Sequence, residues 1–160
     1  MKKRLAFIAM ALAAIGAVVF WTVGPAGSST GSTRIHLIAH QIGLSPLAGT
    51  NLSQNAPPKQ GDGFVFNETL TTPSGAAAGH DGVVCVVTSS LSPQGVGELQ
   101  CTGTAVLAGG QLTATGIINT GSQTSRLAIT GGSGVYRNAH GELTVTDIND
   151  NTSDFVFTIT

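Results

Sequence analysis

Glu68 is the residue of this sequence with the clearest chemical potential. It lies in the run 62–71, where Phe64, Phe66 and Leu70 occupy the positions that alternate in step with it. Because successive side chains of a β-strand point to opposite faces, all four would share one face. Apolar surroundings would disfavour the charged carboxylate, raise its pKa and make Glu68 a candidate acid. Alternatively, Glu68 lies at the strand end and reaches solvent.

Histidines offer weaker candidates. His36 and His40 are four residues apart in a predicted strand and so share a face. No third ligand accompanies them, so we expect outward or interface positions and no metal site. His80 and Asp81 end the Gly- and Ala-rich segment 72–81, which we interpret as a loop, either solvated or covering one end of the domain. The sequence has no serine nucleophile elbow, phosphate loop or HExxH motif, and we expect no cofactor.

The two cysteines predict a structural disulfide. Cys85 and Cys101 lie in the candidate strands 83–89 and 96–107, joined by a turn around Pro93, which is their midpoint. They would therefore face each other directly, with Cα atoms about 4.5 Å apart in a non-hydrogen-bonded pair, which is within disulfide reach. Closing this loop would stabilise the fold by about 3 kcal/mol. A reactive thiol or a metal-binding pair remains the alternative.

Length and charge narrow the class of protein that must position these residues. The 160 residues suit one domain, and the 22 glycines with recurrent Thr and Val are typical of an all-β protein. The formal net charge is -1, but three of the seven basic residues are at positions 2–4. The remainder has four basic against eight acidic residues. Such an acidic surface argues against nucleic acid as a partner.

The N-terminus is predicted to be a targeting segment. A basic stretch precedes the uncharged, mostly apolar run 5–24, and small residues follow near Ala26. This pattern is typical of a secretory signal peptide, here residues 1–26. If it is not cleaved, residues 5–24 are long enough to anchor the protein in a membrane. Either outcome places the domain outside the cytoplasm, where the cysteines could oxidise. The Gly/Ser/Thr-rich residues 27–33 would form a linker.

Alternating apolar residues and turn signals predict eight strands in the remaining chain. The run 83–89 is β-branched enough to suit a strand buried on both sides, and residues 43–60 form a long loop with three prolines. The candidate strands are 34–42, 62–71, 83–89, 96–107, 111–118, 124–130, 142–148 and 154–160.

Eight antiparallel strands joined mostly by short turns favour a closed barrel. Closure removes exposed strand edges, and eight strands enclose just enough room for side chains or one small ligand. Small residues at Gly103, Ala105, Ala114 and Gly116 favour a partly empty lumen. A flattened sandwich is the alternative architecture.

The glycine-rich stretch 127–145 is the most distinctive sequence in the chain. It contains four glycines and Tyr136 between two alternating runs. Glycine permits positive φ and close backbone approach, so this stretch predicts a sharp corner between strands. Tyr136 is large and rigid enough to plug that corner from inside. The alternative is a mobile surface loop.

Several motifs resemble the dirigent and allene oxide cyclase barrel superfamily. Residues 129–141 resemble its I-T-G-G-S-G-x-[FY]-x-x-A-x-G segment, and residues 34–42 resemble the dirigent opening strand L-H-x-Y-x-H-D-I. Residues 61–70 are similar to the dirigent G-D-x-x-V-F-[DN]-D-x-L, and residues 84–87 to the cyclase L-C-V-V. The resemblance implies an eight-stranded antiparallel barrel over residues 34–160, often trimeric, with an apolar central cavity.

The resemblance also implies positions for a site. Leu37 and Ala39 stand where the cyclase has its catalytic glutamate and a pocket asparagine, while Pro46 and Phe66 match its pocket proline and phenylalanine. Gln41 stands at the first-strand aspartate of dirigent proteins.

Two further positions complete the comparison. Glu68 stands at the second dirigent aspartate, where it keeps a carboxylate, and at a second cyclase asparagine. The dirigent loop arginine falls near His80. The resemblance implies that the side chains of Leu37, Ala39 and Gln41 face the lumen.

Our functional hypothesis is an exported barrel that binds an apolar small molecule in its lumen and steers its cyclisation or coupling, an isomerase-like activity. Leu37, Phe64 and Phe66 would shape the pocket, while Glu68 and Gln41 would orient polar atoms. The alternative is a non-catalytic, ligand-binding or structural secreted barrel. A cavity of roughly 300 Å³ with Glu68 inside would favour the first, and a filled lumen the second.

Overall fold

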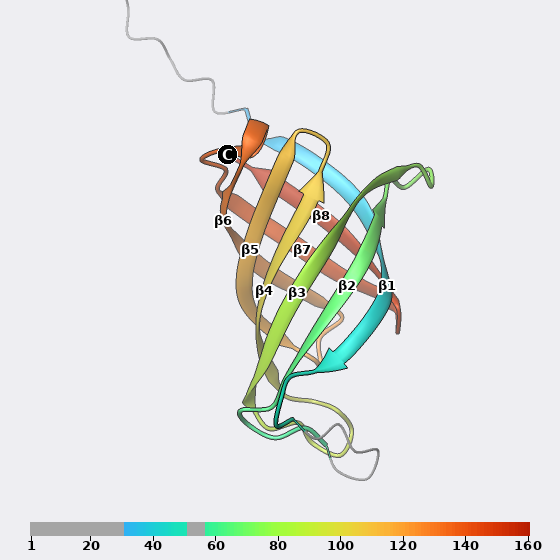
Figure 1. Ribbon diagram of the computed structural model, residues 1–160, viewed down its shortest axis with the longest axis vertical. Helices are drawn as coiled ribbons and strands as arrows, with labels where there is room; N and C mark the ends of the chain where they lie inside the picture. The colour runs from blue at the N-terminus through green and yellow to red at the C-terminus, as the bar shows by residue number, and fades with distance from the viewer. Residues whose placement is uncertain (1–30, 51–56) are drawn as a thin grey trace, which may run out of the picture.

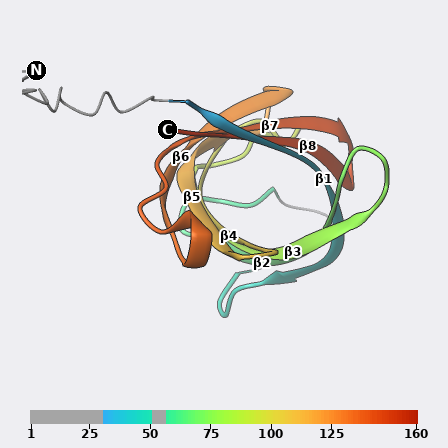
Figure 2. The same cartoon turned by 90° about the horizontal axis from the view of Figure 1, so that it is seen from above.

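The described part of the chain, residues 31–50 and 57–160 of a computed structural model, folds into a closed barrel of eight antiparallel strands. Each strand pairs with its neighbours in sequence, and β8 pairs with β1 to close the ring (Figures 1 and 2). The predicted barrel is thus confirmed. The predicted signal segment 1–26 and most of the linker 27–33 lie outside the described residues. The strands are β1 (Thr33–Pro46), β2 (Gly63–Thr71), β3 (Ala77–Ser89), β4 (Glu98–Leu107), β5 (Gly110–Asn119), β6 (Thr124–Gly132), β7 (Gly141–Asn149) and β8 (Thr152–Ile159).

Strand β3 differs from its prediction in two ways. It begins at Ala77, so the loop expected over 72–81 is limited to residues 72–76, and His80 and Asp81 are strand residues. Gly and Ala have low strand propensity, but pairing with β2 on one side and β4 on the other overrides it. Burial of β3 on both faces is also wrong, since Val84 is 46% exposed. A barrel wall has only one face toward the core, and Val84 lies on the other.

A β-bulge interrupts the pairing of β1 with β2 next to Glu68. Gln41 pairs with Glu68 of β2, but the next paired residue of β1 is Gly43, so Ile42 is the extra residue and is 62% exposed. Such a bulge bends a strand and redirects its side chains. It lets β1 continue to Pro46, four residues beyond the predicted end.

The core fills the barrel interior in two groups. The smaller group surrounds Cys85 and Cys101 and includes Val87 and Leu99. The larger group spans the rest of the lumen and contains Leu37, Ala39, Leu70, Ala105, Leu112, Ala114, Leu127, Ile129, Ala139, Leu143, Phe155 and Phe157.

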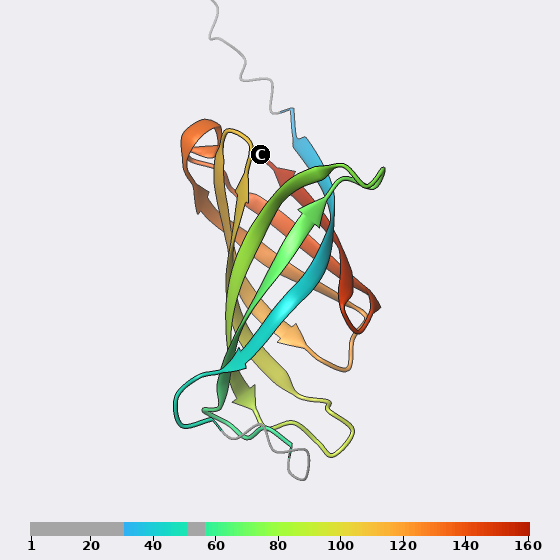
Figure 3. The ribbon, with the colours of Figure 1, turned by 45° about the vertical axis from the view of Figure 1, so that its right-hand side comes forward.

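The glycine-rich stretch forms the predicted corner at one end of the barrel. A short 3₁₀ turn, η1 (Gly134–Tyr136), follows β6 and lies beside the β4–β5 turn (Figure 3). Gly134 has a φ of 62°, and a Cβ there would overlap the carbonyl oxygen of Gly109. Tyr136 is half-buried against the core, and its hydroxyl donates to the carbonyl oxygen of Ala108 at 3.4 Å. The corner therefore closes this end of the barrel.

Candidate functional site

Two buried carboxyl groups lie next to each other on the inner face of the barrel wall. Glu68 of β2 and Asp81 of β3 are direct partners in the strand register, and each is only 5% exposed. Glu68 continues the inward row that includes Leu70, as predicted, whereas Asp81 continues the inward row of Cys85 and Val87. Glu68 Oε2 and Asp81 Oδ1 have no hydrogen-bond partner within the described residues. Buried, unpartnered carboxyl oxygens are costly, which makes this pair a candidate site.

Burial changes the protonation of both groups. The pKa of Glu68 is raised to about 8. Burial is the largest cause, and the negative charge of Asp81 is the next. Burial also raises the pKa of Asp81 to about 6, although its hydrogen bond with Glu68 and the nearby His80 oppose the increase. At neutral pH the pair therefore holds one proton, with Asp81 ionised.

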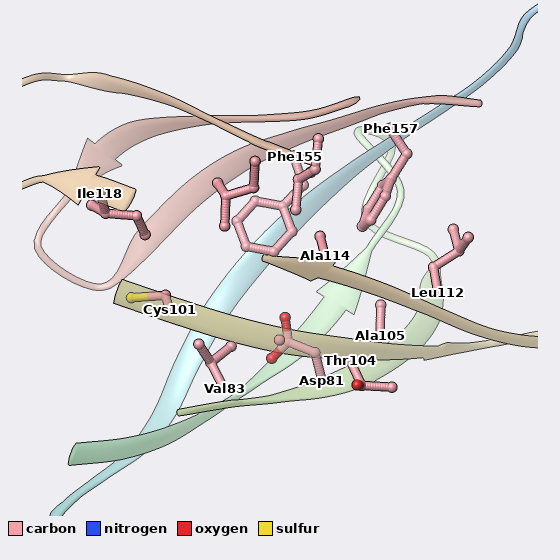
Figure 4. Close-up of a pocket in the computed structure, with 13 residues that line it drawn as sticks. Asp81, Val83, Cys101, Thr104, Ala105, Leu112, Ala114, Ile118, Phe155 and Phe157 are labelled. Atoms are coloured by element: carbon pink, nitrogen blue, oxygen red, sulfur yellow. The ribbon is translucent and has the colours of Figure 1, made fainter. Parts of the chain in front are cut away.

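The pair lies between two cavities of different size. A cavity of about 390 Å³ opens at the end of the barrel that carries the β7–β8 turn, and Glu68 is part of its wall. We call this space the mouth cavity; its lining comprises Gln41, Phe66, Glu68, Ile118, Val145 and residues 147–153. An inner cavity of about 50 Å³ lies deeper, and Asp81 projects into it among Ala105, Ala114 and Phe155 (Figure 4).

The mouth cavity combines an apolar wall with a polar one. Phe66, Ile118, Val145 and Ile148 form the apolar part, while Gln41, Asp147 and residues 149–153 form the polar part. Gln41 fixes the turn, because its backbone N–H donates to the carbonyl oxygen of Asn151 at 3.0 Å. None of the described residues that line the cavity is basic, so its field is negative.

The other predicted site residues are divided between the cavity and the core. Leu37 and Ala39 face inward as the resemblance implies, but they are packed in the larger core group. Phe64 packs against the smaller group, with its ring 6.4 Å from that of Phe66. Pro46 is exposed at the end of β1 and lines neither of the two cavities.

Asp81 and Asp147 are the site residues that the sequence interpretation missed. Asp81 was assigned to a loop, yet its position continues the alternation of Val83 and Cys85 in the same strand. Extending the alternation of inward and outward side chains back from Cys85 would have placed Asp81 on the inward face. Asp147 comes near Glu68 only through closure of the barrel, and its charge contributes to the raised pKa of Glu68.

His36 and His40 lie on the outer face of β1, away from the buried Leu37 and Ala39. His36 lies on the outside, with Nε2 2.7 Å from Asp154 Oδ2. His40 Nε2 is 3.3 Å from the hydroxyl of Thr71. Across the described residues, no three His, Cys, Asp or Glu side chains are grouped so as to hold a metal ion. No helix in residues 31–50 and 57–160 is long and apolar enough to cross a membrane.

The predicted disulfide is present in the structure. Cys85 and Cys101 are directly opposed in the β3–β4 register, their Cα atoms are 4.1 Å apart, and both are almost fully buried. The bridge therefore ties β3 to β4 four residues along β3 from Asp81. A disulfide of this kind is typical of proteins outside the reducing cytosol.

Solved structures with the same fold include proteins named for several reactions. A pyocyanin demethylase superposes with a TM-score of 0.67 at 24% identity, over 80% of this chain and 100% of that one. An exo-specific intermolecular Diels-Alderase superposes with a TM-score of 0.64 at 15% identity, over 81% and 98%. A pterocarpan synthase dirigent protein superposes with a TM-score of 0.61 at 17% identity, over 81% and 83%.

No curated protein matches the sequence. The family described as the allene oxide cyclase barrel like domain matches residues 46–158, so the match covers all of β2 to β7 and most of β8. With the closed eight-stranded barrel, this match shows that the protein belongs to the allene oxide cyclase barrel like family.

Proposed function

We propose that this protein is exported, binds a small, largely apolar molecule in the mouth cavity and steers its cyclisation or coupling. The observation that carries the proposal is a cavity of about 390 Å³ with Glu68 in its wall. This volume is within the range of about 300–1,000 Å³ that is usual for small-molecule sites. The sequence hypothesis placed the ligand deeper in the lumen, and we now place it at the mouth.

The small inner cavity supports this change of position. At about 50 Å³ it has room for a few water molecules but not for an organic ligand. Leu37, Ala39 and Phe64 would then act as supporting wall rather than as ligand contacts. Phe66, Ile118 and Val145 would bury the apolar part of the ligand.

Glu68 would act on a polar atom of the bound molecule. Its raised pKa keeps it protonated at neutral pH, so the carboxyl can exchange a proton with the ligand as charge develops in the transition state. The amide of Gln41, the cross-strand neighbour of Glu68, would hold the ligand in the reactive orientation. Catalysis would then consist mainly of positioning one reactive conformer in a site of low polarity.

Export is supported by the basic and apolar N-terminal segment together with the disulfide. In this proposal residues 1–26 are a signal peptide, or residues 5–24 remain as a membrane anchor, and residues 34–160 form the functional domain. N-terminal sequencing of the mature protein tests it: a chain that begins near residue 27 indicates cleavage. Light scattering of the same sample tests the homotrimer that the family resemblance suggests.

Native mass spectrometry of protein purified from its source identifies the ligand, and the Glu68→Gln variant then tests the mechanism. Glutamine preserves the shape of the side chain and removes its titration. We expect conversion of the ligand to fall by roughly 100-fold, the lower range for loss of a general acid. Glu142→Gln is the matched control, because this glutamate side chain is 45% exposed and its ion pair within the described residues is with Arg126, at 3.4 Å.

A second candidate function is a carrier barrel that binds the ligand without changing it. The packed inner lumen favours it, since the larger core group fills most of the interior. Ligand conversion that is unchanged in Glu68→Gln would remove Glu68 from any mechanism. Binding without conversion by the unmodified protein would establish the carrier function.

A further inference from the structure

We infer that Glu68 and Asp81 act as one proton-sharing pair whose free oxygens accept hydrogen bonds, and that the ligand of the mouth cavity therefore carries a hydroxyl or N–H donor and no carboxylate. Asp81 is the positioning residue of this pair, since it lines the inner cavity while Glu68 lines the mouth cavity. The statement about the ligand rests on the proposed function. The statement about the pair concerns the ligand-free protein and stands without it.

The geometry allows only one negative charge on the pair. The two carboxyls are direct cross-strand partners, each 5% exposed, in a wall whose neighbouring core is apolar. Two like charges this close in a medium of low polarity do not both ionise, because their repulsion adds to the cost of burial. The pair therefore retains a proton that two separate surface carboxyls would lose.

The groups around the pair decide where the proton resides. On the β1 side, Glu68 faces the neutral Gln41, and from β7 it feels the negative charge of Asp147. Asp81 feels the nearby His80, which favours its ionised form. The proton therefore belongs mainly to Glu68, and Glu68 shares it with Asp81 through their hydrogen bond.

This arrangement fixes the kind of hydrogen bond that a ligand can make. Glu68 Oε2 and Asp81 Oδ1 are buried and have no partner within the described residues, so the pair has acceptor capacity that no protein donor satisfies. A hydroxyl or N–H group of the ligand would donate to the Glu68 carboxyl from the mouth cavity, and the negative charge of the pair would strengthen that bond. A ligand carbonyl would instead have to compete with Asp81 for the proton. A ligand carboxylate would be repelled by the single negative charge of the pair and by Asp147.

The ligand-free protein tests the pair first. In protein labelled with ¹³C at its carboxyl carbons, we expect Glu68 to titrate well above the ordinary 4.5. Asp81→Asn removes the neighbouring charge and should lower the Glu68 titration by roughly one pH unit or more. Asp147→Asn is the matched control and should lower it less. Titration of Glu68 near 4.5 in the unmodified protein, or no change in Asp81→Asn, would overturn the pair.

Three probes with one ring system then test the ligand class: 1-naphthalenemethanol, 1-acetylnaphthalene and 1-naphthoate. At neutral pH we expect the alcohol to bind roughly tenfold or more tighter than the ketone, as a hydrogen bond to a charged group predicts. We expect the carboxylate to bind weakest. In Glu68→Gln the preference for the alcohol over the ketone should fall below about threefold.

The carboxyl titration and the binding probes test the proton-sharing pair and the ligand class separately. Equal affinity for alcohol and ketone, or tightest binding of the carboxylate, would overturn the inference about the ligand class. If Glu68 titrates as expected and none of the three probes binds, the proposed small-molecule function fails while the proton-sharing pair stands.

Discussion

The two ends of the barrel are built from the same eight strands but serve different purposes. At the end closed by the glycine-rich corner, Phe157, Leu112 and Leu70 are almost fully buried. At the other end, the group around Cys85, Cys101 and Val87 is equally buried, but the mouth cavity and the two carboxyls lie beside it. Burying ionisable groups lowers stability, so the apolar packing of the barrel must offset what the two carboxyls cost.

Strand β2 shows the change from one end to the other within a single row of side chains. Leu70 is packed in the larger core group, Glu68 stands at the boundary, and Phe66 lines the mouth cavity. All three point into the barrel, so alternation alone makes them equivalent. They differ in their position along the barrel axis, which places Leu70 in the packed core and Phe66 at the mouth cavity.

The largest expected effect comes from emptying the closed end. Phe157→Ala removes a buried ring, and we expect the free energy of unfolding to fall by about 3–5 kcal/mol. Phe66→Ala, at the half-buried mouth, should cost less stability but should weaken ligand binding. Urea denaturation of both variants checks the contrast, with Phe157→Leu as a milder variant. Equal losses at the two ends would contradict the division between them.

Removing the disulfide should have the next largest effect. The double variant Cys85→Ala/Cys101→Ala opens a loop of sequence separation 16, for which the chain-entropy estimate is about 3 kcal/mol. Because the bridge ties β3 to β4 in the core group that contacts Phe66 and Ile118 of the mouth cavity, we also expect lower hydrogen-exchange protection near the mouth than at the closed end. Denaturation with and without reductant provides the comparison, and an unchanged midpoint would show that the bridge contributes little.

A single methyl group at the glycine-rich corner should cost roughly 1–3 kcal/mol. Gly134→Ala forces a side chain into a left-handed conformation and against the carbonyl oxygen of Gly109. Gly131→Ala is the matched control in the same segment, since nothing lies within 4 Å of its added Cβ. Thermal unfolding of the two variants should differ clearly. A Gly134→Ala protein as stable as Gly131→Ala would show that the corner does not need its backbone conformation.

The smallest expected effect is the change in the free energy of unfolding with pH, which the two carboxyls near the mouth cavity cause. Folding raises the pKa of Glu68 from 4.5 to about 8 and that of Asp81 from 3.8 to about 6, so the native state holds these protons more tightly than the unfolded chain. This stabilisation is fully present below the unfolded pKa values and is lost as pH rises through about 8. Each group contributes a slope of at most about 1.4 kcal/mol per pH unit.

Unfolding of Glu68→Gln between pH 4 and pH 9 checks this prediction. The decline in stability between pH 6 and pH 8 should disappear in the variant, because Glu68 is the group that titrates there. The exposed Glu142→Gln control should keep the decline. A decline that persists unchanged in Glu68→Gln would show that another group causes it.

Local sequence was sufficient for several parts of this structure. The turn around Pro93 is enough to place Cys85 opposite Cys101, because an antiparallel hairpin pairs residues symmetrically about its turn. Glu68 was found because it shares its strand face with Phe64 and Phe66. The family motifs supplied the closed barrel and the inward direction of Gln41.

Asp81 and the position of the cavity were not accessible in this way. Asp81 lies in a Gly- and Ala-rich stretch that becomes a strand only because β2 and β4 pair with it on both sides. The lumen looked roomy from its small residues, yet Phe155 and Phe157 of β8 fill the space opposite Ala105 and Ala114. Both outcomes depend on contacts between distant strands, which no local pattern contains.

Alternation and turn residues were enough to predict the eight strands in order, the disulfide and the row that contains Glu68, because these signals act over a few residues. The contacts of Glu68 with Asp81 and Asp147, and the open space at the mouth, follow from the closed barrel. The pKa of a carboxyl depends on its burial and on charges within a few ångströms, and barrel closure alone brings those charges together.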